Sequence, residues 1–170
     1  MRRAALFILL LFAASPVWAA TKTYTDPRHL YSIDYPDGWR MKEAPVISFL
    51  SPFESRKDPF AENVSVQIED LSRASGGMSL LDYHRQSMGN APADLQDFKV
   101  LEEARTEFLG HAAIAVLYTA TVNGKRFKFK DYKLMLGKDA YVLTYTALSA
   151  DYDKYLPAAE KVMHSLRASP

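Results

Sequence analysis

The sequence predicts an α+β fold in which a central, mostly antiparallel β-sheet is flanked by helices. Several segments alternate apolar and polar residues, as residues 63–69 do, and this period of two is typical of strands with one buried face. The dipeptide Asn123-Gly124 separates two long strand-like runs and is the strongest short-range signal of a β-hairpin. Apolar residues at helical spacing in residues 151–167 predict a helix that packs on the sheet.

The first predicted strand covers residues 31–35 and ends at Pro36-Asp37-Gly38, a combination that favours a tight turn. Trp39 follows directly, and we expect its ring to fold back onto the core. A polar, proline-marked loop is expected at residues 51–62. Further strands are predicted at residues 46–50, 63–69, 98–108, 111–122, 125–136 and 140–148.

Two helices are expected. The first begins after Ser79, which can cap it together with Asp82 at the third helical position, and ends near Gly89-Asn90. The second lies within residues 151–167, where Pro157 lacks the N–H that a helix interior needs. We therefore expect the regular part of this helix to begin near Pro157.

Residues 1–19 are predicted to form a secretory signal peptide. Arg2 and Arg3 give it a positive start, residues 4–14 are apolar, and a cut after Ala19 leaves a small residue before the cleavage point. A membrane-spanning helix needs roughly 20 apolar residues, so this shorter run predicts no permanent anchor. The chain has no cysteine, so a lipoprotein is not expected either. We expect residues 20–170 to form a single domain that is periplasmic or secreted, and soluble after cleavage.

The composition argues against several classes of function. Removing Arg2 and Arg3 leaves 19 basic and 20 acidic residues, a formal charge of −1, which does not suit a nucleic-acid-binding protein. Without cysteine there are no disulfides, no thiol redox chemistry and no CxxC-type zinc sites. The chain also lacks GxSxG, P-loop and GxGxxG motifs, so we expect no enzyme activity and no catalytic residues.

The histidines do not form a local metal motif. None is spaced from another as in HxH, HxxxH or HExxH sites. A site assembled from distant segments, such as His29 with Asp26 or Asp34, remains open, and its carboxylates would suit calcium or manganese. No cofactor is expected. The four histidines are His29, His84, His111 and His164.

Residues 125–133 carry the strongest concentration of positive charge. In a strand, Arg126, Lys128 and Lys130 share one face while the phenylalanines between them face the other. Such a stripe can dock an acidic protein or an anionic surface, although charges on a strand face are also an ordinary solubilising feature. The apolar alternation changes phase after Asp131, which predicts a β-bulge at Lys130-Asp131. The candidate partner-binding residues here are Lys125, Arg126, Lys128, Lys130 and Lys133.

Part of the predicted loop, residues 53–60, is a second candidate for partner contact. It combines aromatic and basic side chains, and exposed loops of this kind often carry binding residues. The alternative is a solvated connection whose phenylalanines tuck beneath the sheet. The candidate residues of the loop are Phe53, Arg56, Lys57 and Phe60.

The order of these signals resembles the PsbP-like family, which includes lumenal PsbP proteins and DcrB-type envelope proteins. The resemblance covers residues 24–167 and implies an α-β-α sandwich around a central antiparallel sheet. It rests on YSIDYPDGW at residues 31–39, FAENVSV at 60–66, Ser79-Leu80 before the middle helix, the Asn123-Gly124 hairpin, YVLTY at 141–145 and HSLR at 164–167.

The resemblance implies a binding or assembly module, because members of this family look like such modules and a fold by itself does not fix a function. We therefore expect a non-enzymatic, exported accessory protein that binds or helps to assemble another envelope component, either a protein or an anionic surface. Two alternatives stay open: a periplasmic protein that binds calcium, manganese or zinc, and an accessory protein of the photosystem II oxygen-evolving type. The oligomeric state is left open.

Overall fold

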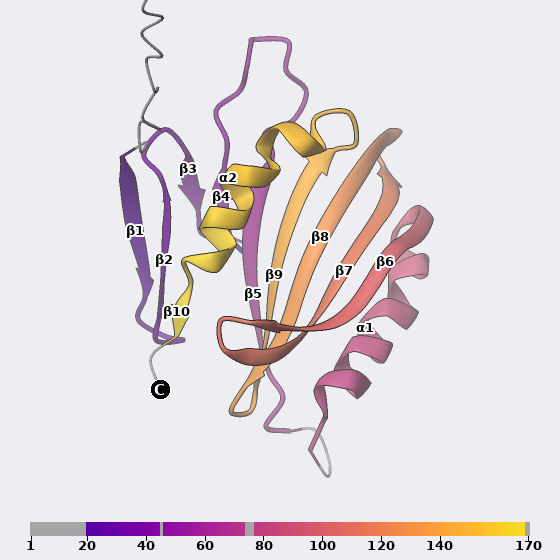
Figure 1. The fold of residues 1–170 in the computed structure, drawn as a ribbon. Coiled ribbons are helices and arrows are strands. Elements are labelled where there is room, and N and C mark those ends of the chain that lie inside the picture. Colours follow the sequence, from indigo (N-terminus) through magenta and orange to yellow (C-terminus); the bar gives the residue numbers. More distant parts are fainter. Residues whose placement is uncertain (1–19, 45, 74–76, 169–170) are drawn as a thin grey trace, which may run out of the picture.

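The computed structural model describes residues 20–44, 46–73 and 77–168, so the predicted signal peptide lies outside the described residues. The described chain forms two antiparallel sheets and two helices (Figure 1). The seven-stranded main sheet has the order β3-β4-β5-β9-β8-β7-β6, and the small sheet has the order β1-β2-β10. Among the described residues, no helix is both long and apolar enough to cross a membrane.

The elements have the following bounds. The main sheet contains β3 (Arg40–Lys42), β4 (Ile47–Leu50), β5 (Asn63–Asp70), β6 (Gln96–Phe108), β7 (His111–Val122), β8 (Lys125–Leu136) and β9 (Asp139–Leu148). The small sheet contains β1 (Thr21–Asp26), β2 (Tyr31–Pro36) and β10 (Arg167–Ala168). The helices are α1 (Leu80–Asp94) and α2 (Tyr152–His164).

The predicted α+β class is confirmed, with a mostly antiparallel sheet and helices packed on it. The predicted hairpin has the expected residue bounds in β7 and β8. Its turn residues Asn123 and Gly124 have φ angles of 50° and 74°. Positive φ at both central positions is what the two-residue type I′ turn requires, and its twist matches that of the paired strands.

The two helices cover opposite faces of the main sheet. On β8, Lys130 forms an ion pair with Glu160 of α2, whereas Lys133 donates to the Ser87 hydroxyl of α1. Because side chains alternate along a strand, even-numbered residues of β8 face α2 and odd-numbered residues face α1. The small sheet lies beside α2 (Figure 1).

The main core lies between the main sheet, α2 and the small sheet. Leu134, Leu143 and Met163 are fully buried there, and the predicted anchor Trp39 is 7% exposed. The turn before Trp39 closes with its N–H donating to the Pro36 carbonyl at 2.9 Å. Smaller apolar clusters lie on the α1 face.

Both helix boundaries differ from the sequence prediction. Ser79 caps α1 as expected, accepting the Asp82 N–H at 3.1 Å, but the helix continues through Gly89 to Asp94. A glycine inside a helix costs only about 1 kcal/mol, which surrounding contacts can offset.

α2 begins at Tyr152 and contains Pro157, so the prediction that the regular helix begins near that proline is wrong. Pro157 is exposed, so solvent can reach the backbone carbonyl that its missing N–H leaves without a helical partner.

The β-bulge predicted at Lys130-Asp131 is also wrong. β8 pairs in continuous register with both neighbours across this point. The apolar residues change phase because the α1 face, which is buried along the strand, carries the polar pair Asp131 and Lys133 in its later half. Phe127 and Phe129 pack in a cluster on the α1 face near the start of β8, and Leu134 packs in the main core on the α2 face near its end.

Candidate binding surfaces at the two ends of the sheet

The two segments predicted to contact a partner meet at one end of the main sheet. The loop at residues 51–62 and the β7–β8 turn lie together at this end (Figure 1), which we call the loop end. The Phe60 ring packs edge-on against Phe127 with centroids 4.8 Å apart, and the Lys125 ammonium donates to the Pro59 carbonyl at 3.5 Å. The sequence predicts the loop and the basic start of β8 as two separate candidate surfaces, and the fold brings them into contact.

The loop is held in shape by its own hydrogen bonds and by α2. The Asp58 carboxylate accepts the N–H groups of Glu54 at 2.9 Å and Phe60 at 3.1 Å, and these bonds lower its pKa. Glu54 in turn pairs with Lys154 and accepts the Tyr155 hydroxyl at 2.9 Å. The loop is therefore tethered to α2 at its tip.

The outer side of the loop exposes an aromatic ring among basic groups. Phe53 is 52% exposed, and the Arg40 guanidinium lies 5.2 Å from its ring centroid. Arg56 and Lys57 are exposed nearby in the chain. An open depression of about 520 Å³ is lined by Phe53, Ser55, Arg56 and Asp58. Aromatic residues and arginine are enriched in protein interfaces, so this side of the loop has the composition of a contact surface.

The continuous basic stripe predicted on β8 is not present. The Lys128 ammonium lies 4.2 Å from the Tyr152 ring centroid, and Lys130 is half-buried against Glu160. Lys125 and Arg126 remain exposed at the turn. α2 covers the face on which the stripe was expected, so those lysines stabilise the packing of this helix.

Lys133 is buried, which corrects its assignment as a partner-binding residue. It is 2% exposed, and its ammonium lies 3.7 Å from the equally buried Asp131 carboxylate and 2.9 Å from the Ser87 hydroxyl. Burial raises the pKa of Asp131 and lowers that of Lys133, since it penalises both charged forms. Strand alternation could have revealed that Lys133 is buried. It lies four residues after the core residue Phe129, so both side chains point to the same face of the strand.

Three histidines each place one ring nitrogen close to a single carboxylate. Nδ1 of His29 lies 3.2 Å from Asp26, Nε2 of His84 lies 3.1 Å from Glu103, and Nε2 of His164 lies 3.2 Å from Glu160. Within the described residues, no group of three or more histidine and acidic side chains could hold a metal ion. The metal-site alternative therefore has no geometric support in this part of the chain.

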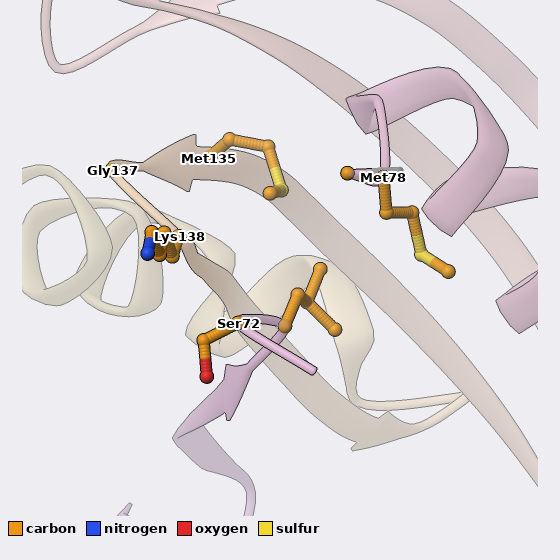
Figure 2. A pocket seen from close by; sticks show the side chains of 7 residues that line it. Ser72, Met78, Met135, Gly137 and Lys138 are labelled. Atoms are coloured by element: carbon orange, nitrogen blue, oxygen red, sulfur yellow. The ribbon is translucent and has the colours of Figure 1, made fainter. Parts of the chain in front are cut away.

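The opposite end of the molecule is hollowed, and we call it the cavity end. A cavity of about 560 Å³ lies between the β1–β2 turn, the β8–β9 turn and the start of β7. A second hollow of about 250 Å³ shares Met135, Gly137 and Lys138 with it (Figure 2). Figure 2 shows Gly137, Lys138 and Ser72 on one side of that hollow and Met78 on the other.

No local pattern in the sequence predicts the cavity end. Its lining comes from four segments that are far apart in the chain, and residue spacing cannot reveal such a grouping. His29 was considered from the sequence as part of a metal site. The larger cavity is lined by Arg28, His29, Leu30, His111, Met135, Leu136, Gly137, Lys138, Asp139, Tyr141 and Ala168.

The fold and these surfaces define an α+β domain with a shaped loop at one end and a cavity at the other. The PsbP family model matches residues 19–168, so the chain belongs to the PsbP family. This confirms the family resemblance in the sequence. A search of curated proteins found no match.

Several solved structures share the fold. PA94 from Pseudomonas aeruginosa, a protein of unknown function, has a TM-score of 0.64 and 20% identity, covering 88% of this chain and 98% of its own. The cyanobacterial PsbP of Synechocystis sp. PCC 6803, CyanoP, has a TM-score of 0.60 and 15% identity, covering 94% and 99%. LpqN of Mycobacterium tuberculosis, described as involved in cell envelope biogenesis, has a TM-score of 0.59 and 14% identity, covering 93% and 88%.

Proposed function

We propose that this protein is a non-enzymatic, exported accessory protein of the PsbP family that binds another component of the cell envelope through its loop end. The observation that carries the proposal is the exposed Phe53 ring, held beside basic groups on a loop that is tied to α2. A loop shaped before binding loses less conformational entropy when a partner docks.

The envelope context rests on two supports. Residues 1–19 have the pattern of a secretory signal peptide. The description of LpqN places one protein of this fold in envelope biogenesis. CyanoP shares the fold at 15% identity, and that likeness adds no specific support for a photosystem role.

The loop end also indicates the chemistry of the partner. Its exposed cations include Arg40, Arg56, Lys57, Lys125 and Arg126, and the Glu54 carboxylate is neutralised by Lys154. A complementary surface would place an apolar pocket over Phe53 and carboxylates around it, since opposite potentials steer and orient association. We therefore propose an acidic envelope protein as the partner.

Affinity capture from an envelope extract tests this function. The bait proteins are the mature chain, the double variant Phe53→Ala/Arg56→Glu, and a control, Lys99→Glu, whose charge lies on the exposed strand β6. We expect one acidic protein to be retained by the mature chain and the control and reduced at least about tenfold by the double variant, because aromatic and arginine anchors carry most interface energy. Equal retention by the double variant would contradict the loop end as the contact surface.

A further inference from the structure

We infer that the larger cavity at the cavity end is a binding site for a small organic anion with an apolar body, such as a medium-chain carboxylate. The site is separate from the loop end and does not depend on the function proposed above. At about 560 Å³ the cavity falls within the size range of small-molecule sites.

Positive groups dominate the charged part of the lining. Arg28 and Lys138 provide two permanent cations, and the rings of His29 and His111 add hydrogen-bonding nitrogens. Asp139 is the one carboxylate among the residues that line this cavity. Charge-assisted bonds from such donors are the strong way to hold a carboxylate.

The nearby carboxylate of Asp26 forms hydrogen bonds within the β1–β2 turn. It is buried, and its Oδ1 accepts the N–H groups of Arg28 at 2.8 Å and His29 at 3.1 Å. Its Oδ2 lies 3.2 Å from Nδ1 of His29. Asp26 therefore does not compete with a bound anion, and it fixes the segment that carries two of the basic groups.

The orientation of His29 suits a ligand contact. Asp26 occupies Nδ1, and Nε2 has no hydrogen bond to any residue in the described part of the chain. The Tyr141 hydroxyl donates to the His29 carbonyl at 3.2 Å, which ties the turn to β9. These contacts from Asp26 and Tyr141 hold the His29 ring and its backbone in one geometry.

The cavity also has an apolar part. Leu30 is 55% exposed and has a φ angle of 52°, a left-handed conformation that is uncommon for leucine and that the clamped turn maintains. Met135, Leu136 and Tyr141 contribute further apolar surface. Basic and apolar groups around one hollow match a molecule with a charged head and a short hydrocarbon body.

The test is a calorimetric titration of the mature chain with octanoate, beside octanol and inorganic phosphate. We expect saturable octanoate binding that is at least about tenfold tighter than octanol binding, because the alcohol lacks the charge that the basic groups recognise. We also expect phosphate to compete weakly, since it has no apolar body. No saturable octanoate binding, equal binding of octanol, or phosphate displacing octanoate at equal concentration would each overturn the inference.

Single substitutions locate the site. Arg28→Gln and Lys138→Gln change exposed side chains, so both variants are expected to fold as the parent does, and a melting curve checks this. Each should weaken octanoate binding about tenfold, whereas Lys57→Gln at the loop end should leave it unchanged. Unchanged affinity in both cavity variants, or an equal loss in the Lys57 control, would place binding elsewhere and overturn the assignment.

Discussion

At the scale of single residues, the Tyr31 hydroxyl is buried and has no hydrogen-bond partner among the described residues. Its ring packs against the rings of Tyr24 and Tyr141, with centroids 6.1 Å and 6.5 Å away. Burial raises the pKa of this hydroxyl, so it is neutral in the physiological range. An unpaired buried hydroxyl loses its hydration without compensation, at a cost of about 1–3 kcal/mol.

Tyr31→Phe should therefore leave the free energy of unfolding unchanged or raise it by up to about 1 kcal/mol, because the ring contacts remain and the unpaired group is removed. Tyr145→Phe is the matched control. Its hydroxyl donates to the Tyr152 carbonyl at 2.8 Å, so its loss should cost about 1 kcal/mol. Urea denaturation measures both values, and equal destabilisation by the two variants would show that Tyr31 has a partner.

The Lys133–Asp131 pair gives a second prediction at this scale. Lys133→Met leaves Asp131 buried without its cation, which should destabilise the protein by about 3–5 kcal/mol at neutral pH. Lys133 holds the pKa of Asp131 down against the effect of burial, so the substitution raises that pKa further.

The effect should depend on pH with a definite sign. Above about pH 4 the unfolded Asp131 is ionised, while the folded variant retains the proton until its raised pKa, so stability falls as pH rises through this window. Comparing urea midpoints at about pH 5 and pH 7 should show the larger loss, relative to the parent, at the higher pH. A loss that is the same at both values would mean that Asp131 is not left as an unpaired buried charge.

At the scale of elements, Pro157 leaves α2 without one main-chain hydrogen bond in the middle of the helix. Pro157→Ala restores the N–H at an exposed position. The substitution should raise stability by about 1–2 kcal/mol, which is the helix gain less the entropy that proline removes from the unfolded chain. Thermal unfolding checks this, and a lowered melting temperature would contradict it.

Element prediction from the sequence worked where a local rule decides the structure. The Asn123-Gly124 turn fixes the bounds of β7 and β8, and strict alternation identifies β5. The strands β1, β3 and β10 were missed because they are mostly exposed, so their residues show little alternation of apolar and polar side chains, and β3 and β10 are also short. The apparent bulge in β8 arose because Asp131 and Lys133 form a buried polar pair on the face where Phe127 and Phe129 also pack, and a single strand's sequence does not reveal such a pair.

At the scale of the whole molecule, the surface at the loop end could be predicted in part from the sequence, whereas the cavity at the opposite end could not. At the loop end, composition alone drew attention to Phe53 and Arg56, and the fold added the contact between Pro59 of the same loop and Lys125 of the β7–β8 hairpin. Lys128, Lys130 and Lys133 contact the helices, which the sequence could not show because their exposure depends on where the helices pack. The cavity end depends on the closure of the small sheet against the main sheet, a long-range arrangement without a local motif.

Photocross-linking in intact cells tests the binding function at the loop end most directly. A photoreactive phenylalanine analogue replaces Phe53 in one variant and Lys99 on β6 in another, and covalent adducts are identified by mass spectrometry. We expect a discrete adduct with one acidic envelope protein from position 53, lost when Arg56→Glu is added, and none from position 99. No adduct from position 53, or the same adducts from both positions, would contradict a partner-binding role for the loop end.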